Sequence, residues 1–294
     1  MHYRKLLIVI LPLLGFQCNA QYIEQAIASG VDHRHVDVSQ IGGGIAVFDL
    51  NNDGFEDLYL TGGSEPDKLF LNDGDGTFTD ISASSAILSI AGLQTVGVTT
   101  GDIDNDGDRD IFVTTTRTDH NILFLNNGDT TFTDISLSAG ITDTTWSTSV
   151  TMGDYNNDGY LDIYVANYAE YVTNPFFLTI SSGIGNTLYQ NNGDLTFTDV
   201  SIASGTSDLG TSLAVAFTDF DSDQDVDLLL GNDFGYNYEP NALFQNNYPI
   251  NDFSNVASTT FTDDEIDAMG IAIGDFDEDG DFDYYISNMM GNLL

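Results

Sequence analysis

The 294-residue chain is poor in cysteine, proline and basic residues. It has one cysteine, five prolines, and six lysines and arginines against 46 aspartates and glutamates, which gives a formal net charge of −40. Such a charge repels the phosphates of nucleic acids and the headgroups of anionic membranes, so neither is expected as a partner. So few cations also leave little means of stabilising an oxyanion or a phosphate, which argues against that kind of catalysis.

Long apolar runs are missing too, apart from one near the N-terminus. Two basic residues, Arg4 and Lys5, precede an apolar run that ends at Phe16, and small residues follow it. This pattern predicts a signal peptide over residues 1–20, cleaved near Ala20/Gln21. We therefore expect a secreted, extracellular or cell-surface protein.

The mature chain should then be free of both membrane spans and thiols. The N-terminal run is too short to cross a bilayer, and no later segment approaches eighteen apolar residues. The only cysteine, Cys18, would leave with the signal, which excludes disulfides, a thiolate nucleophile and cysteine metal ligands. The remaining chain is nevertheless apolar enough to fold, because 41% of the residues are hydrophobic and 12% aromatic. A folded chain of this charge needs counter-ions, and divalent cations are the first candidates.

What the sequence does contain is an internal repeat. A nine-residue acidic pattern has Asp at positions 1, 5 and 9, Asp or Asn at position 3, and usually Gly at position 6. Its starts are 52 to 65 residues apart. The copies are Asp49–Asp57, Asp102–Asp110, Asp154–Asp162, Asp219–Asp227 and Asp275–Asp283.

Two further patterns keep the same phase. A short run of β-branched and small residues precedes each acidic copy, and an Asn-Gly turn between apolar or Thr-rich runs follows three of them, as at Leu69–Ser82. Each unit reads as four short antiparallel strands in roughly fifty residues, which is typical of a propeller blade. The sequence therefore predicts an all-β fold, a β-propeller of four-stranded antiparallel blades over residues 21–294, with few helices.

The acidic copies have the chemistry of calcium loops. Oxygen side chains at positions 1, 3, 5 and 9 and the backbone carbonyl of position 7 surround a hard cation, whereas nitrogen and sulfur ligands are absent. An EF-hand is excluded, because position 12 is apolar in every copy instead of Glu. We predict up to five Ca²⁺ ions. The expected ligands are Asp49, Asn51, Asp53, Phe55 and Asp57; Asp102, Asp104, Asp106, Asp108 and Asp110; Asp154, Asn156, Asp158, Tyr160 and Asp162; Asp219, Asp221, Asp223, Asp225 and Asp227; and Asp275, Asp277, Asp279, Asp281 and Asp283.

The fourth copy departs from the pattern at position 6, where Gln224 replaces Gly. A left-handed backbone at that position costs a residue with a Cβ about 1 kcal/mol. We expect this site to bind calcium more weakly or to be slightly distorted.

These patterns resemble those of the FG-GAP/VCBS repeat family, which includes the N-terminal propeller of integrin α chains. The pairing of Gly-x-Ala-x-x-x-Asp strands with Asn-Asn-Gly-Asp-x-Thr-Phe-Thr-Asp-Val-Ser segments is most similar to exported bacterial propellers related to cartilage acidic protein. The resemblance covers nearly all of Tyr22–Leu294 and implies a propeller, usually seven-bladed, with calcium between the first two strands of a blade. Five blades begin here and the last is incomplete. The chain is therefore expected to be a fragment of a longer ring, or else a five-bladed ring closed by a strand at Tyr22–Ile27.

A ligand is expected on the face away from the acidic loops, where the connections vary in length. Asp162 to Asn191 spans 29 residues, whereas Asp57 to Asn72 spans 15. Exposed aromatic side chains over a rigid ring suit a protein or glycan, although packing between blades is an equal alternative. The candidates are Trp146, Tyr168, Tyr171, Phe176, Phe177, Tyr236 and Tyr238.

The function predicted from these features is a calcium-binding adhesion or ligand-binding module, with no catalytic residues. The alternative is a calcium-dependent carbohydrate-active enzyme of the polysaccharide lyase type, or a non-catalytic domain of one. A lyase would need a basic residue above a calcium ion, and only Arg109 lies close enough in sequence.

Overall fold

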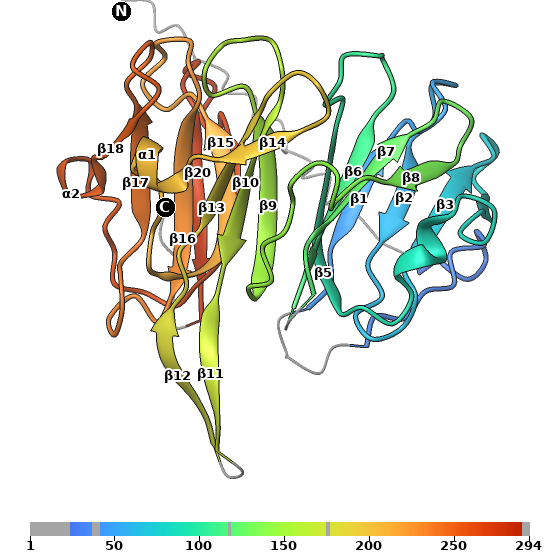
Figure 1. The fold of residues 1–294 in the computed structure, drawn as a ribbon, viewed down its shortest axis with the longest axis horizontal. Helices are drawn as coiled ribbons and strands as arrows, with labels where there is room; N and C mark the ends of the chain where they lie inside the picture. Colours follow the sequence, from blue (N-terminus) through green and yellow to red (C-terminus); the bar gives the residue numbers. More distant parts are fainter. Residues whose placement is uncertain (1–23, 37–41, 117–118, 175–176, 290–294) are drawn as a thin grey trace, which may run out of the picture.

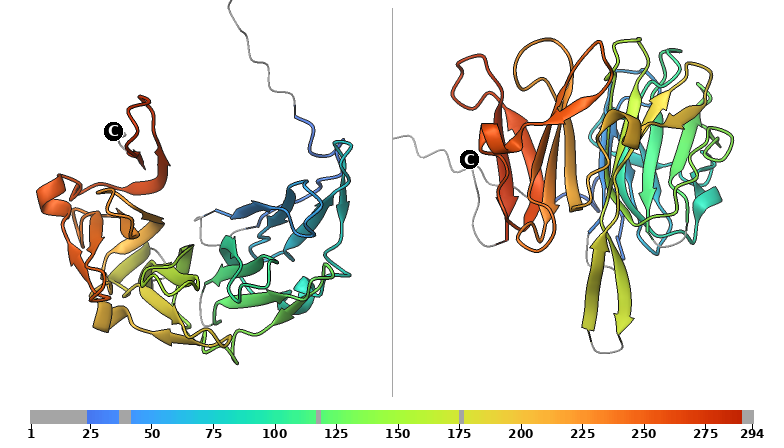
Figure 2. Two further views of the ribbon diagram at one scale, coloured as in Figure 1. Left: turned by 90° about the horizontal axis from the view of Figure 1, so that it is seen from above. Right: turned by 60° about the vertical axis from the view of Figure 1, so that its left-hand side comes forward.

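The protein is all-β in a computed structural model that describes residues 24–36, 42–116, 119–174 and 177–289. The predicted signal peptide and its cleavage site lie outside the described residues. Five sheets follow one another along an open arc, with a two-stranded hairpin projecting from the third (Figures 1 and 2). The predicted blade architecture is confirmed.

Each of the first four blades is a four-stranded antiparallel sheet in which consecutive strands pair, the third containing the projecting hairpin between its second and third strands. The strands of the first two are β1 (Ile45–Phe48), β2 (Asp57–Leu60), β3 (Lys68–Asn72) and β4 (Phe78–Asp80), then β5 (Thr95–Gly101), β6 (Asp110–Thr115), β7 (Ile122–Asn126) and β8 (Phe132–Asp134). The third has β9 (Ser147–Gly153), β10 (Asp162–Asn167), β13 (Thr187–Asn191) and β14 (Phe197–Asp199). The fourth has β15 (Thr211–Thr218), β16 (Asp227–Asp233), β17 (Ala242–Asn246) and β18 (Phe253–Asn255).

The first strand of each blade lies against the first strand of the next, from β1 through β5, β9 and β15 to β19 (Ala268–Gly274). Glycines allow this approach. A Cβ on Gly97 of β5 would lie 2.5 Å from the carbonyl oxygen of Thr148 in β9. The short runs of small and β-branched residues that precede the acidic copies therefore form the first strands, which lie close to one another between neighbouring blades.

Apolar side chains from adjacent blades form the cores. One core joins blades one and two through Tyr59 and Phe124, and further cores join blades two and three and blades three and four. Helical structure in the described residues is limited to single turns, η1 (Ile87–Ile90), α1 (Ser201–Ser204) and α2 (Ala257–Thr260). None of the described helices has the length and apolar character needed to cross a membrane.

The fifth blade has two strands in the described part of the chain, β19 and β20 (Asp283–Asn288). The alternative of a five-bladed ring was based on a closing strand at Tyr22–Ile27. The structure describes Glu24–Ile27 of this segment, and these residues form coil and the start of a turn instead of a strand. The carbonyl of Ser29 in the same turn accepts a hydrogen bond from the backbone N–H of Phe78. The carbonyl of Ser85, which follows the last strand of blade one, accepts a hydrogen bond from the backbone N–H of Phe132 in blade two. The N-terminal segment therefore contacts blade one as the end of blade one contacts blade two.

The long connection of the third blade, between Asp162 and Asn191, contains regular structure. It forms a second hairpin, β11 (Ala169–Asn174) and β12 (Phe177–Gly183), which projects on the side away from the acidic loops (Figure 1). The backbone pairs from Ala169–Gly183 to Asn174–Phe177, so it satisfies its own hydrogen bonds without the body of the blade.

Candidate metal centre and ligand face

Each acidic copy is the loop between the first and second strands of a blade; we number the loops one to five in chain order. The position-1 carboxylate organises the loop by accepting the backbone N–H groups of positions 5 and 6. In loop one, Oδ1 of Asp49 lies 3.0 Å from the nitrogen of Asp53, and Oδ2 lies 2.8 Å from that of Gly54. The same pair of bonds recurs in all five loops. The in-phase repeat in sequence is thus a repeat in conformation.

The position-9 aspartate begins the second strand and is the most deeply buried acidic residue of loops one to four. In loops one to four it is at most 1% exposed. One oxygen accepts the position-2 N–H at 2.8–3.1 Å, and the other accepts the N–H of the Asn that ends the third strand at 2.7–2.8 Å. Burial raises the pKa of Asp110, Asp162 and Asp227 to about 7, because the charged form loses its hydration.

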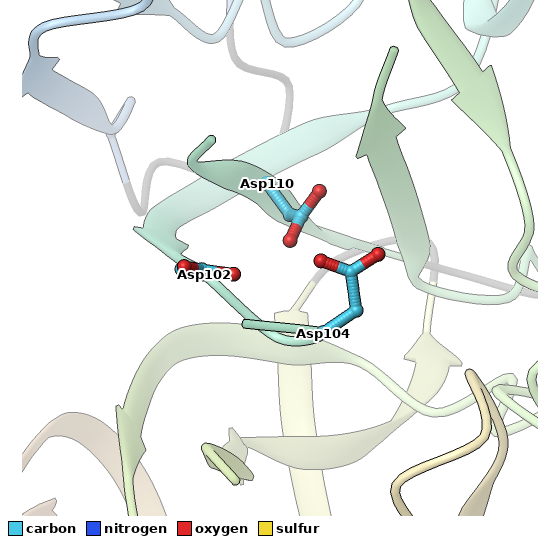
Figure 3. Close-up of side chains that lie close together, drawn as sticks. All are labelled: Asp102, Asp104 and Asp110. Carbon is cyan, nitrogen blue, oxygen red and sulfur yellow. The ribbon is translucent and has the colours of Figure 1, made fainter. Parts of the chain in front are cut away.

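The structure brings several predicted ligands together. In loop two, carboxylate oxygens of Asp102, Asp104 and Asp110 lie within 4.8 Å of one another and point toward a common space (Figure 3). Loop four does the same with Asp219, Asp221 and Asp227, and loop five with Asp275, Asp277 and Asp279.

Loops one and three differ because position 3 is an amide. The Nδ2 atoms of Asn51 and Asn156 donate to the position-5 carboxylates Asp53 and Asp158, both at 2.9 Å. These loops therefore carry one carboxylate fewer at the centre, and their amide oxygens accept the position-5 N–H.

The donor set fits calcium. The side chains gathered in the loops are carboxylates and amides, hard oxygen donors with no imidazole or thiolate. At position 7 of loop four, Oδ1 of Asp225 is buried without a hydrogen-bond partner. Burial and the charge of Asp223 raise the pKa of Asp225 to about 6. An uncompensated carboxylate cluster of this kind is an environment that a bound cation relieves.

The backbone confirms the reasoning about position 6 and adds a second position. Gln224 adopts φ 77°, as the glycines of the other loops do with φ between 88° and 99°. Position 4 is left-handed as well, at Asn52, Asn105, Asn157, Ser222 and Glu278. The signal that sequence reasoning missed is Asn at position 4 in three of the five copies, since Asn tolerates this conformation better than most residues.

A second missed set is the Asn at the end of each third strand, interpreted from sequence only as a turn residue. These side chains reach under the acidic loops and donate to the carbonyl of position 8, as Asn191 does to Leu161 at 3.1 Å. The set is Asn72, Asn126, Asn191 and Asn246.

The opposite face separates the candidate aromatic residues into different environments. Trp146 and Tyr168 are 7% and 6% exposed and pack edge to face at 6.2 Å, and the Tyr168 hydroxyl donates to Asp233 at 2.6 Å. For these two, packing between blades is the correct alternative. Tyr236 is 55% exposed, and Tyr238 is half-buried. Tyr171 and Phe177 belong to the projecting hairpin, and Phe176 lies outside the described residues.

A polar pocket of about 340 Å³ lies on the third blade between its two flanking blade-to-blade links. Hydroxyls and carboxylates line it, among them Thr142, Asp143, Asp199 and Ser207, with Ile202 as an apolar residue at 89% exposure. Tyr189 forms part of its floor, and burial, followed by the charge of Asp143, raises the pKa of Tyr189 well above its usual value. The tyrosine is therefore a neutral hydroxyl here.

The basic residues do not build a catalytic group in the described part of the chain. Arg109 donates from Nη2 to the carbonyl oxygen of Thr100 at 2.9 Å, which ties it to its own blade. Lys68 pairs with Asp80 at 2.6 Å on the surface. His33 and His35 face the same way, as their alternation predicts, and both contact the carbonyl oxygen of Thr61 at 2.9 Å.

The fold and the loops define a propeller-type protein built from acidic-loop repeats. The family model of the FG-GAP-like repeat matches residues 49–113, 102–165 and 219–286, and the chain belongs to this family. The chain is also similar to cartilage acidic protein 1 of Mus musculus, with 27% identity over 96% of this chain and 46% of the relative. For the protein of the same name from Homo sapiens the identity is 26%, over 97% and 45%.

This chain thus spans about half the length of the curated relatives that it matches. Among solved structures, it is similar to an Agrocybe aegerita lectin whose title describes specific recognition of non-reducing terminal N-acetylglucosamine. The TM-score is 0.50 and the identity 18%, over 83% of this chain and 60% of the lectin. That likeness supports the fold.

Proposed function

We propose that the protein is a secreted calcium-binding propeller that acts as an adhesion or ligand-binding module and not as an enzyme. The observation that carries the proposal is the recurrence of one loop conformation in five blades, with only oxygen donors at its centre. The signal peptide predicted over residues 1–20 supports secretion. Outside the cell, free calcium is high enough to fill such loops. Arg109, the basic residue that a lyase mechanism would need above a calcium ion, is hydrogen-bonded to Thr100 of its own blade, which favours the binding module over the lyase.

Calcium would be held by the side chains at positions 1, 3, 5 and 9 of each loop and the carbonyl of position 7. Bound there, it would supply positive charge to carboxylates that are otherwise buried or crowded. The chain's own contribution is the set of N–H groups that hold each carboxylate in place.

The ligand we propose is a neutral glycan bound in the pocket of the third blade. Its lining offers hydroxyls and two carboxylates to sugar hydroxyls and Ile202 to an apolar sugar face, and it contains no cation for an anionic ligand. The recognition of N-acetylglucosamine by the structurally similar lectin makes amino sugars the first compounds to screen.

Two measurements test the proposal. Residues 21–294 should melt at a much higher temperature in millimolar calcium than in chelator, and equilibrium dialysis should count four or five ions per chain. A folded chain that is indifferent to calcium would refute the metal assignment.

For the ligand, a glycan array should show binding that Thr142→Trp, at the exposed edge of the pocket, abolishes while calcium-dependent melting stays unchanged. Leu209→Trp is the matched control, because Leu209 is 59% exposed and outside the pocket lining. Glycan binding that survives Thr142→Trp would place the ligand elsewhere.

A further inference from the structure

The position-9 carboxylates of neighbouring loops are joined by a short chain of hydrogen bonds. Oδ2 of Asp110 in loop two accepts the backbone N–H of Ile103 at 2.9 Å. The carbonyl of Ile103 accepts from Nδ2 of Asn191 at 2.8 Å. The backbone N–H of Asn191 donates to Oδ1 of Asp162 in loop three at 2.8 Å. Asn191 of blade three thus connects Asp162, a predicted calcium ligand of loop three, to the backbone that holds Asp110, the corresponding ligand of loop two.

The connection recurs between other loops. Asn246 donates to the carbonyl of Tyr155 at 2.7 Å and to Asp227 at 2.8 Å, which joins loops three and four. Asn126 joins loops one and two through the carbonyl of Leu50, with a longer bond of 3.5 Å. Asn126, Asn191 and Asn246 are at most 3% exposed, so water does not compete for these bonds.

A second link runs across the loop surface. Nδ2 of Asn105, at position 4 of loop two, donates to the carbonyl of Gly159 in loop three at 2.9 Å. Asn52 of loop one reaches Asp108 of loop two at 2.9 Å in the same way. Two independent contacts therefore connect loops one and two, and two connect loops two and three.

We propose that these contacts couple neighbouring calcium loops, so that occupation of one loop favours occupation of the next, and that Asn126, Asn191 and Asn246 are the positioning residues that transmit the effect. The inference rests on the proposed calcium function. An ion bound in loop two fixes Asp110 and hence the backbone at Ile103, which presents a fixed acceptor to Asn191. Asn191 in turn holds Asp162, so part of the ordering that loop three needs has already occurred.

Asn72 provides the matched control. It makes the same bonds within its own loop, from its N–H to Asp57 and from Nδ2 to Glu56. It is only half-buried, and among the described residues its side chain has no hydrogen bond to another acidic loop. Asn72→Ala therefore removes the contact within loop one and leaves the contacts between loops in place.

The experiment is a calcium titration by equilibrium dialysis on residues 21–294, with calcium as the only probe. The wild-type isotherm should be steep, with a Hill coefficient above one. Asp158→Ala, which disables loop three, should lower the affinity of the remaining loops by about fivefold or more. In an Asn105→Gly/Asn191→Ala/Asn246→Ala background, which cuts both deep links of loop three and its surface link to loop two, the same change should remove one ion with little effect on the others. Asn72→Ala should preserve the wild-type coupling.

Each other result is decisive. Ions that bind independently in the wild type, or coupling that survives loss of all three Asn side chains, would overturn the inference and leave the calcium proposal standing. Absence of calcium binding would refute both. If the buried Asn variants fail to fold, Asn105→Gly keeps the left-handed backbone and removes only the surface link between loops two and three, and it should weaken the same coupling. Asn157→Gly is its control, because the structure shows no hydrogen bond from the Asn157 side chain to loop four in the described chain.

Discussion

Single residues decide how well each acidic loop is formed, and position 6 is the clearest case. Gln224 holds the left-handed conformation that the other loops give to glycine. This difference concerns the backbone alone, because a Cβ on Gly159 of loop three would meet no atom within 4 Å.

Replacing Gln224 with Gly should stabilise the calcium-loaded protein by about 1 kcal/mol, because glycine adopts positive φ without the Cβ penalty. Urea unfolding in millimolar calcium measures the change. The reverse substitution, Gly159→Gln, should cost a similar amount. Equal stability of wild type and both variants would show that position 6 is not strained.

Sequence reasoning reached these residues unevenly. The expected metal ligands and the left-handed position 6 follow from side-chain chemistry at fixed spacing, which one sequence displays directly. The role of Asn191 depends on a carbonyl 88 residues away. No local sequence pattern includes that partner. From the sequence alone, Asn191 is therefore explained equally well as a turn residue.

Individual strands carry hydrogen bonds between blades, and at one pair of blades such a bond is missing. Nδ2 of Asn121 donates to the hydroxyl of Ser147 in the first strand of the next blade, and Asn186 makes the same bond to Ser212. At the fourth blade Nδ2 of Asn241 is buried without a partner, because the equivalent residue of β19 is Ala268.

Ala268→Ser should supply the missing acceptor and stabilise the protein by about 1 kcal/mol, the net value of one buried hydrogen bond. Thermal unfolding in calcium reports the gain. Ser147→Ala is the matched loss and should destabilise by about 1–3 kcal/mol, since it leaves Asn121 unsatisfied. A destabilised Ala268→Ser variant would contradict the equivalence of the two positions.

The projecting hairpin is an element that the blade can do without. Ala169 and Gly183 pair across its base, so residues 170–182 can be replaced by Asn-Gly, which forms a two-residue turn between paired strands. We expect the shortened protein to keep its calcium-dependent melting temperature within a few degrees, as measured by circular dichroism. A large loss would mean that the hairpin stabilises the blade.

The strands were predictable because runs of β-branched, small and apolar residues lie in phase between the acidic loops and the Asn-Gly turns, whereas the hairpin was not. Tyr168 to Phe177 reads as an aromatic loop in sequence. Burial of Tyr168 against Trp146 depends on the meeting of two blades, which periodicity within one segment cannot show.

At the scale of the whole molecule, charge links stability to both pH and calcium. The pKa values of Asp110, Asp162 and Asp227 rise from 3.8 to about 7 in the folded, metal-free chain. Between about pH 4 and about pH 7 the folded chain therefore holds protons that the unfolded chain has released, and its stability falls as the pH rises.

In chelator, the melting temperature should decrease as the pH is raised through this window. Calcium binds the ionised carboxylates, so the increase in melting temperature that it causes should grow over the same range. Differential scanning calorimetry with and without calcium at a series of pH values tests both trends. A metal-free protein that becomes more stable as the pH rises would contradict the burial of these carboxylates as neutral groups.

The neighbour-to-neighbour pattern of the bonds between blades has an evolutionary consequence. Within the described residues, the inter-loop hydrogen bonds of Asn191 join loops two and three, and the Asn121–Ser147 bond joins two adjacent blades. A substitution in one repeat is therefore felt by at most two others, so each repeat can diverge while the rest keep their shape. The Gln in loop four, the Ala in β19 and the inserted hairpin in the third blade are differences of this kind: each lies in a single unit, and the effect of Ala268 reaches Asn241 of the adjacent fourth blade.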